Sequence, residues 1–305
     1  MSDKIIIAGG TGNLGKSIIN LLQGTYGKKL FILTRGISRE ESGIHYIHWN
    51  PDSENSKWHQ LLEDSYAIIN LSGKSVNCRY NERNKEALIS SRINPTLAIG
   101  KAISSLSNPP KVWINASSAA IFGNSGENLK YEWDATGLGF PAIICKKWED
   151  AFNQSVTSST KKVILRMGLV FQKDIGLLQP FVRLAKFYLG GKFGNGVQYI
   201  SWIHEQDFQN IIYESLYNEN YHGIIHCSSP YPVTNNDFMM CLRNTLKIPI
   251  GIPHPAWLLK LGSLIIGTES ELLINGRAVV SGRLEQYGFR FKYPLIKDAL
   301  QDLIH

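Results

Sequence analysis

The sequence lacks paired cysteines. Its four cysteines are scattered along 305 residues, and none forms a C-x-x-C pair. A disulfide framework and a thiolate zinc site both need cysteines at short, regular spacing. The eight histidines likewise show no H-E-x-x-H or similar arrangement of metal ligands. We therefore predict no bound metal and a reducing compartment, which indicates a cytoplasmic protein.

Long apolar runs are missing as well. The longest, at 255–266, is interrupted by Lys260. It is shorter than the roughly 20 residues that a membrane-spanning helix needs. A strand begins almost at the N-terminus, at Ile5, and leaves no room for a signal peptide. We expect no membrane segment and no membrane partner.

Basic residues outnumber acidic ones but are dispersed. The formal net charge is +7 and the pI is near 9.1, values that suggest nucleic-acid binding. However, the basic residues form only short groups, such as 146–147 and 161–162, without a concentrated arm or a stacking motif. We predict solvated faces and no nucleic-acid partner. Such a surface would also attract a phosphorylated cofactor.

A glycine-rich turn stands near the N-terminus. Residues 5–8 are typical of a buried parallel strand, and residues 16–22 have a helical pattern. Between them, Gly9 permits a sharp turn, Gly12 lets a pyrophosphate approach the backbone, and Gly15 lets the helix lie close to the strand. The alternative is an ordinary turn, because glycine is common in turns. We predict that a dinucleotide binds Gly9, Thr11, Gly12, Asn13, Leu14 and Gly15.

The second predicted strand, 30–34, ends at Arg35. Here, about 20 residues after the last glycine, a dinucleotide-binding fold meets the adenosine ribose. An NAD enzyme places a carboxylate at this point, whereas this chain places Thr34 and Arg35. A guanidinium holds a 2′-phosphate through charge-assisted hydrogen bonds. The cofactor predicted is therefore NADP(H) rather than NAD(H), and the alternative is a surface arginine at a strand end.

Strands and helices alternate over the first part of the chain, which predicts an α/β fold with a Rossmann-type, doubly wound parallel sheet. The predicted strands are 5–8, 30–34, 44–49, 67–71, 111–117 and 162–167, and the helices are 16–22, 58–62, 80–106 and 140–152. Pro95 is expected to kink or divide the long helix near Asn94.

The pattern becomes less regular after about residue 170. We predict strands at 199–203, 224–227 and 288–291, and helices at 207–216 and 296–304. The chain is divided accordingly into an NADP-binding domain, 1–170, and a smaller mixed α+β lobe, 171–305. We expect this lobe to lie on the substrate side and to be interwoven with the first domain.

Several motifs together resemble the extended short-chain dehydrogenases/reductases, which include sugar-nucleotide epimerases and dehydratases. These motifs are the glycine turn, Asn70-Leu71-Ser72-Gly73 and the stretch 117–123. The chain also resembles an atypical subgroup, the NADP-dependent epimerase-family or oxidoreductase-like proteins. This resemblance rests on residues 91–96, 147–149, 190–207 and 229–235. The subgroup's C-terminal domain of unknown function is similar to 252–303, so the resemblance covers nearly the whole chain.

The resemblance implies cofactor contacts at strand ends and on the long helix. They are Thr34, Arg35, Leu71, Ser72 and Arg92, with Gly73 leaving space beside them. For Arg92 the alternative is an exposed helix residue. The substrate implied is a small carbonyl or hydroxyl compound of unknown identity.

The catalytic pair of this class is missing. Short-chain dehydrogenases use a tyrosine and, four residues later, a lysine on the same helix face. The lysine lowers the pKa of the tyrosine, whose hydroxyl then transfers a proton. Here the two positions are Phe140 and Ile144, and no tyrosine occurs between 132 and 187. The class serine corresponds to Ser118, or to Ser117 after a one-residue shift, and either hydroxyl could instead bond to nearby backbone.

Other titratable candidates are few. The loop before the helix 140–152 contains Tyr131, Glu132 and Asp134, for which solvated positions are the alternative. His204 and Asp207 stand at a predicted strand-to-helix junction. We predict that His204 is a packed histidine rather than a cleft residue, and that Asp207 is a helix N-cap.

Two functions follow from these patterns. The first is an NADP(H)-dependent oxidoreductase or epimerase/dehydratase-like enzyme, and we favour it. The second, motivated by Phe140 and Ile144, is a non-catalytic NADP(H)-binding sensor whose nucleotide alters a protein partner. Related folds dimerise through helices that flank the sheet, so the helix at 82–106 leaves a homodimer open.

Overall fold

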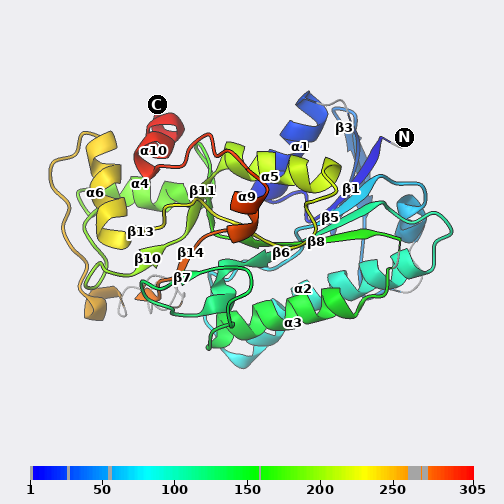
Figure 1. Cartoon of the computed structure of the whole chain (residues 1–305), viewed down its shortest axis with the longest axis horizontal. Coiled ribbons are helices and arrows are strands. Elements are labelled where there is room, and N and C mark those ends of the chain that lie inside the picture. The colour runs from blue at the N-terminus through cyan, green and yellow to red at the C-terminus, as the bar shows by residue number, and fades with distance from the viewer. Residues whose placement is uncertain (1–2, 26–27, 54–56, 158, 260–268, 270–273) are drawn as a thin grey trace.

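The computed structural model describes residues 3–25, 28–53, 57–157, 159–259, 269 and 274–305. The larger part of the molecule is built around an eight-stranded sheet that has helices on both faces (Figure 1). In sheet order the strands are β12 (Gly223–Cys227), β8 (Lys161–Met167), β6 (Val112–Ser118), β5 (Ala67–Asn70), β1 (Lys4–Ala8), β2 (Lys29–Thr34), β4 (Ile44–His48) and β3 (Arg39–Glu41). All neighbours are parallel except β3 and β4, so the predicted doubly wound α/β fold is confirmed.

Strand β1 lies at the centre of this sheet, between β2 and β5. Its residues Ile5, Ile6 and Ile7 are fully buried, because a central parallel strand has both faces covered. The chain continues from β1 to β2 on one side and later returns to β5 on the other. Such a reversal of strand order opens a crevice at the carboxyl ends of the strands, where doubly wound proteins bind ligands.

Helices form a layer on each face of the sheet (Figure 1). One layer contains α1 (Asn13–Ile19), η1 (Asn20–Thr25) and α5 (Glu205–Tyr217), and its apolar side chains pack with Ile5 and Ile7. The other contains η2 (Lys57–Leu62), α2 (Glu82–Ser104) and α3 (Phe140–Gln154), which pack with Ile6 and Ala8. Alternate residues of β1 therefore anchor opposite layers.

Helix α2 runs through Pro95 as one element of 23 residues, so the predicted division near Asn94 is wrong. The Asn81 side chain caps its start by accepting a hydrogen bond from Asn84 N, at 2.9 Å. Pro95 cannot donate a hydrogen bond to the carbonyl of Ser91. Packing of α2 against α3 and the sheet, with Ile99 and Ile103 fully buried or nearly so, outweighs that loss.

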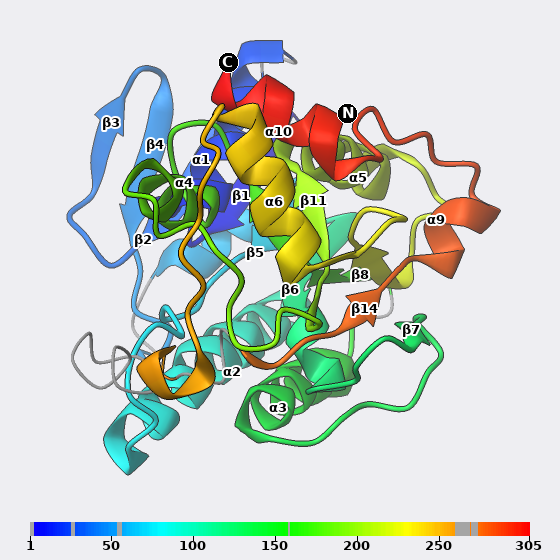
Figure 2. The same ribbon diagram turned by 90° about the vertical axis from the view of Figure 1, so that its left-hand side faces the viewer.

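The smaller lobe is built from short strands and helices. Strand β9 (Leu169–Phe171) pairs with β11 (Trp202–His204), β10 (Tyr199–Ile200) with β13 (Val233–Thr234), and β14 (Ala278–Val279) with β7 (Leu129–Lys130). The helices are α4 (Leu178–Lys186), α6 (Asn235–Thr245), α9 (Gly282–Gln286) and α10 (Ile296–Ile304). Figure 2 shows α10 lying across the end of α6, where Phe238, Leu242 and Leu300 share a core.

Two sequence predictions in this lobe were wrong. The predicted strand 199–203 is two strands, because Ser201 separates pairings with different partners. The segment 288–291 is not a strand. Phe289 and Phe291 instead pack against the main core, and their two rings meet edge to face with centroids 4.8 Å apart. The closing helix 296–304 is confirmed.

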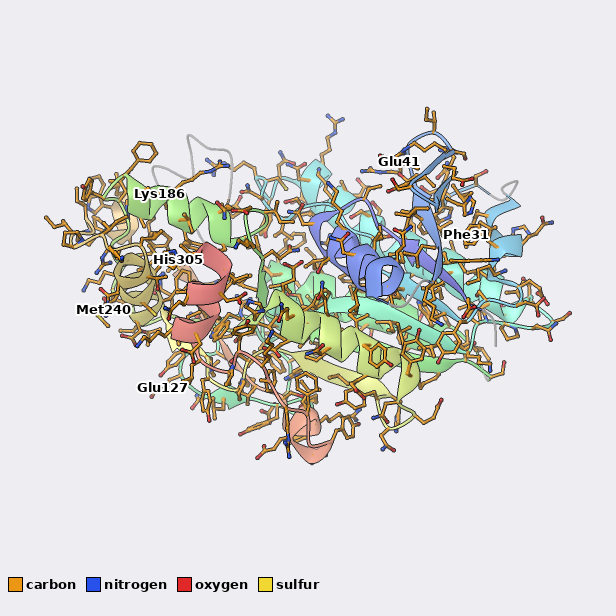
Figure 3. All side chains as sticks on the ribbon, turned by 90° about the horizontal axis from the view of Figure 1, so that it is seen from above. Phe31, Glu41, Glu127, Lys186, Met240 and His305 are labelled. Atoms are coloured by element: carbon orange, nitrogen blue, oxygen red, sulfur yellow. The ribbon has the colours of Figure 1, made fainter. Side chains whose placement is uncertain are left out.

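The two predicted parts of the chain share the main sheet, because β12 forms its edge beyond β8. Seen from above (Figure 3), Phe31 and Glu41 mark one end of the molecule, and Lys186, Met240 and His305 mark the other. Within the described ranges, no helix is long and apolar enough to cross a membrane. Residues 260–266 of the apolar run 255–266 lie outside those ranges.

Candidate functional site

A cavity of about 680 Å³ opens at the carboxyl ends of β1, β5, β6 and β8. One wall consists of the turns that follow these strands, and the opposite wall comes from the smaller lobe, including 198–201 and Arg277. The cavity therefore lies at the reversal of strand order, where the two parts of the chain meet. This is the usual place for a ligand in a doubly wound fold.

The glycine turn forms one end of the cavity, and its three glycines have different roles. A Cβ on Gly9 (φ +77°) would lie 2.9 Å from the Leu71 carbonyl carbon, and one on Gly15 would lie 2.4 Å from the Cα of Gly10. Both glycines are thus required by backbone packing. A Cβ on Gly12 would meet only the Gly9 carbonyl oxygen, at 3.5 Å. The space beside Gly12 is open, as close approach of a ligand to the backbone requires.

Most of the predicted cofactor residues line this cavity. Those that do are Gly9, Gly12, Asn13, Leu14, Gly15, Leu71, Ser72, Gly73 and Arg92. Thr11, Thr34 and Arg35 are not part of its described lining. Thr11 is exposed on the turn, and the other two stand at the end of β2, the strand next to β1.

Arg35 projects from the end of β2 into solvent. Neighbouring Thr34 accepts a hydrogen bond from Gly36 N, at 3.2 Å, which shapes the turn. Among the described residues, no hydrogen bond or ion pair engages the Arg35 guanidinium, and the segment 33–38 contains no carboxylate. The Arg35 side chain is therefore available to an anion.

Arg92 is half-buried beneath the segment that follows β5, so it is not the exposed helix residue of the alternative. Its Nη1 donates to the Leu88 carbonyl, at 2.9 Å, and its Nη2 donates to the Lys74 carbonyl, at 3.0 Å. Its guanidinium lies 5.3 Å from the ring centroid of Trp148. Burial lowers the pKa of Arg92. The residue fixes the 73–74 backbone and places a positive charge on the cavity wall.

The two candidate serines have different surroundings. Ser117 is buried and donates to Glu149 Oε1, at 2.6 Å. Glu149 also accepts from Arg166, through Nε at 2.9 Å and Nη2 at 2.8 Å. Ser118 lines the cavity, and its Oγ accepts from Ala120 N, at 3.1 Å, to cap η3 (Ala119–Phe122). The hydroxyl proton of Ser118 remains available, which favours Ser118 over Ser117 as the substrate contact.

The positions of the class tyrosine and lysine, Phe140 and Ile144, are not part of the described cavity lining. Phe140 packs against Tyr80, with ring centroids 4.9 Å apart, and Ile144 is only 3% exposed. Trp148 is the residue of α3 that lines the cavity, and its Nε1 donates to Thr96 Oγ1, at 3.0 Å. Helix α3 therefore presents no titratable side chain to the cavity.

The loop acids support the fold instead. Glu132 is buried and accepts hydrogen bonds from His226 N, at 2.9 Å, Gly282 N, at 3.1 Å, and the Ser281 hydroxyl. Tyr131 stacks on Trp133, with ring centroids 5.3 Å apart. In the described part of the chain, the cavity lining includes neither Tyr131, Glu132 nor Asp134.

His204 is packed, as predicted. It is 1% exposed, its Nδ1 accepts from Gln206 N, at 3.0 Å, and its Nε2 lies 3.2 Å from an Asp302 oxygen. His204 itself caps α5, so the prediction that Asp207 is the N-cap was wrong. Asp207 lies in the first turn and accepts from the backbone N–H groups of Lys292 and Tyr293. Burial lowers the pKa of His204 and raises the pKa of Asp207.

Sequence reasoning missed the residues that the smaller lobe contributes. They include Gln172, Gln198, Asn235 and Arg277. The Nε2 group of Gln172 donates to the Asn13 carbonyl, at 3.3 Å, and Arg277 Nε donates to the Gly123 carbonyl, at 2.9 Å. Their local sequence carries no signal, because the contacts join segments more than 150 residues apart. No group of three potential metal ligands occurs among the residues placed by the structure.

Comparison with known proteins identifies the relatives of this chain. Epimerase family protein SA0724 of Staphylococcus aureus is 31% identical over 304 residues, and the match covers 98% of both chains. The chain belongs to the epimerase family of short-chain dehydrogenases/reductases. The family predicted from its motifs is thus confirmed. Residues 5–138 match the NAD dependent epimerase/dehydratase family, and 254–303 match a domain of unknown function, DUF1731.

Two further epimerase-family relatives extend the comparison. The chloroplastic SDR39U1 homolog of Arabidopsis thaliana is 29% identical, with coverage of 98% of this chain and 86% of that protein. The crystal structure of human epimerase family protein SDR39U1 (isoform 2) with NADPH superposes with a TM-score of 0.85. That match covers 98% of both chains at 24% identity, and it shows that the two proteins share a fold.

Proposed function

We propose that this protein is an NADP(H)-dependent oxidoreductase or epimerase-like enzyme that acts on a small carbonyl or hydroxyl compound. The observation that carries the proposal is the continuous cavity of about 680 Å³ between the glycine turn and Ser118. A cavity of this size suits a small organic ligand. The human relative was crystallised with NADPH, which supports the same cofactor here.

The residues of the glycine turn fit a dinucleotide. Gly12 leaves the turn open on the cavity side, and α1 begins directly after it, with Lys16 N donating to Gly12 O at 2.9 Å. Ser72 and Gly73 are small residues that line the cavity beside the turn. Arg35 supplies a positive charge at the end of β2, where a 2′-phosphate distinguishes NADP(H) from NAD(H). Arg92 adds a second positive charge on the cavity wall.

Among the described lining residues of the cavity, we assign the substrate contact to the Ser118 hydroxyl. When bound, NADP(H) supplies hydride transfer. Ser118 donates its proton in a hydrogen bond to the substrate oxygen and so orients the substrate. Phe140 and Ile144 supply neither a proton nor a charge, so the proton comes from solvent water or from another lining residue, among which Tyr199 carries a hydroxyl.

A second candidate function is a non-catalytic NADP(H) sensor. It is favoured by one observation: from α3, the described cavity lining includes Trp148 but no acid or base. A sensor requires different affinities for NADP⁺ and NADPH, because a ligand that binds two states equally shifts neither.

The cytoplasmic location and the α2-mediated homodimer also remain predictions.

Titration with NADPH and NADH, followed by nicotinamide fluorescence, tests the cofactor. We expect Arg35→Ala to weaken NADPH binding by about tenfold to a hundredfold, since a charge-assisted contact is worth about 1.5–3 kcal/mol, and to leave NADH binding unchanged. Arg39→Ala is the matched control, because Arg39 pairs with Glu41 at 3.3 Å and stacks on Tyr46. If neither nucleotide binds the wild-type protein, the proposal is wrong.

Turnover then separates the two functions. The wild-type protein is assayed with saturating NADPH and a panel of small carbonyl compounds, beside a Gly12→Asp variant whose carboxylate repels the cofactor phosphates. Turnover above that control supports the enzyme. Absence of turnover together with unequal NADP⁺ and NADPH affinities would support the sensor.

A further inference from the structure

The cavity has a one-sided distribution of charge. Its described charged lining residues are Lys74, Arg92 and Arg277, and the described lining includes no aspartate or glutamate. Charged side chains that leave water are normally paired with an opposite charge. Arg166, just behind the cavity, follows this rule, because Glu149 holds it through two hydrogen bonds. Among the residues that the structure describes, Arg92 and Arg277 have no such carboxylate.

Of the two arginines in the described lining, Arg277 has more unused donors than Arg92. Its Nε donates to the Gly123 carbonyl, at 2.9 Å, while both terminal nitrogens lack an acceptor among the described residues. Its backbone is held firmly, because its N–H donates to Tyr199 O, at 3.0 Å, and its carbonyl accepts from Ser201 Oγ, at 2.7 Å. The side chain is thus positioned, with the two terminal nitrogens of its fork free.

Within the described ranges, no neighbouring group neutralises this charge. Cys145 interacts electrostatically with both Arg92 and Arg277. However, burial raises the pKa of Cys145 to about 12, so its thiol is neutral near pH 7. The carboxylate of Glu149 is already engaged by Arg166 and Ser117. Burial also lowers the pKa of Arg277, as expected for a cation that has lost water without gaining a partner.

The place of Arg277 relates it to the substrate rather than to the cofactor phosphates. Its Nε bonds to Gly123, which directly follows η3 at the carboxyl end of β6. The glycine turn follows β1, and β5 lies between the two strands. Two strand spacings are about 10 Å. Arg277 therefore lies on the Ser118 side of the cavity.

We propose that Arg277 binds an oxyanion of the substrate, a carboxylate or a phosphate, so that the substrates are small anionic carbonyl or hydroxyl compounds. The planar guanidinium fork matches either group through two parallel hydrogen bonds. Placing the reacting carbon beside Ser118 rests on the proposed function, whereas anion binding by Arg277 does not.

Matched aldehydes test this proposal by calorimetry, with and without saturating NADP⁺. The probes are 4-formylbenzoate, its neutral methyl ester and 4-formylphenyl phosphate. We expect at least one anionic probe to bind the wild-type protein about tenfold to a hundredfold more tightly than the ester, the range for charge-assisted hydrogen bonds. The tighter of the two anions identifies the group as carboxylate or phosphate.

Three variants assign the preference to one side chain. Arg277→Met is expected to reduce the preference to less than about threefold, which is the loss expected when both hydrogen bonds disappear. Arg290→Met, which removes the same charge from an exposed position of the same lobe, is expected to retain it. Arg277→Lys, a point charge without the fork, is expected to fall between them.

Equal binding of the ester and both anions by the wild-type protein overturns the proposal without any variant, so misfolding of Arg277→Met cannot hide a failure. An anion preference that survives in a folded Arg277→Met protein overturns it too. NADPH titration of the same samples keeps the two proposals apart. Anion preference without NADPH binding contradicts only the proposed function, and NADPH binding without anion preference contradicts only the role of Arg277.

Discussion

The two ends of the cavity are built in different ways. At the glycine turn, the ligand-facing surface is backbone and small side chains, held by close packing of Gly9 against Leu71 and of Gly15 against Gly10. At the Ser118 end, the nearby polar side chains bind one another. Ser117, Glu149 and Arg166 form a closed, buried network. One end is therefore specified by backbone geometry and the other by side-chain pairing.

This difference shows which part of a site tolerates substitution. The glycines cannot change without moving the backbone, so the turn keeps its shape whatever the substrate. Phe140 and Ile144 occupy the positions of the catalytic pair within a continuous α3, where Phe140 packs against Tyr80 and Ile144 is buried. A dinucleotide-binding shape can thus persist while the proton-transfer groups are lost. Function must be argued from the site and not from the fold.

The network at the Ser118 end gives the largest expected effect. Glu149→Leu leaves Arg166, which is 4% exposed, as an unpaired buried charge. We expect the free energy of unfolding to fall by about 3–5 kcal/mol, the usual cost of removing one partner of a buried pair. Urea denaturation of the two proteins measures the difference.

The matched control is the double variant Glu149→Leu with Arg166→Met. Replacing both members of a buried pair by apolar residues is often neutral, so most of the lost stability should return. A single variant that loses less than about 1 kcal/mol would mean that Arg166 finds another partner or water, and that the network is not what holds this end together.

The glycine turn gives an intermediate effect that differs between neighbouring positions. Gly15→Ala forces a Cβ to within 2.4 Å of the Gly10 backbone. We expect it to lower the free energy of unfolding by about 1–3 kcal/mol, as overpacking does. Gly12→Ala meets no close atom, and its φ of −76° suits any residue, so its stability should remain near that of the wild type.

For nucleotide affinity we expect the opposite order from stability, with the larger loss in Gly12→Ala. Gly12→Ala places a methyl group where the ligand approaches, and we expect NADPH affinity to fall at least about tenfold, or about 1.4 kcal/mol. Thermal unfolding and fluorescence titration of both variants measure the two quantities. Equal affinity of Gly12→Ala and the wild type would show that the ligand does not approach the backbone at this turn.

The same contrast explains how far the sequence could be read. The central strand, the glycine turn and the end of β5 were predicted because their signals are local: apolar runs, glycine spacing and small residues within a few positions. The pairing of Glu149 with Arg166, and that of Arg277 with Gly123, joins separate elements. The short strands around Ser201 depend on tertiary pairing too. Nothing in one segment reports its partner, so that end of the site needed the structure.

The smallest expected effect concerns acid, and it also belongs to the Ser118 end. His226 is fully buried, and its Nδ1 lies 2.8 Å from the Val280 carbonyl, which can only accept. The proton therefore sits on Nδ1, and Nε2 has no hydrogen-bond partner in the part of the chain that the structure describes. Burial lowers the pKa of His226, although Glu132 nearby acts in the opposite direction.

The unfolded chain consequently takes up a proton at His226 before the folded protein does as the pH falls. Stability from the neutral imidazole is complete above the unfolded pKa of about 6.5 and decreases below it, by up to about 1.4 kcal/mol per pH unit. We expect urea denaturation between pH 7.5 and 5.5 to show a steeper loss for the wild type than for His226→Gln. His204, whose pKa is also lowered, contributes equally to both proteins. Parallel losses would assign the acid sensitivity to His204 or to another group, and the two ends of the cavity would then not differ in their response to pH.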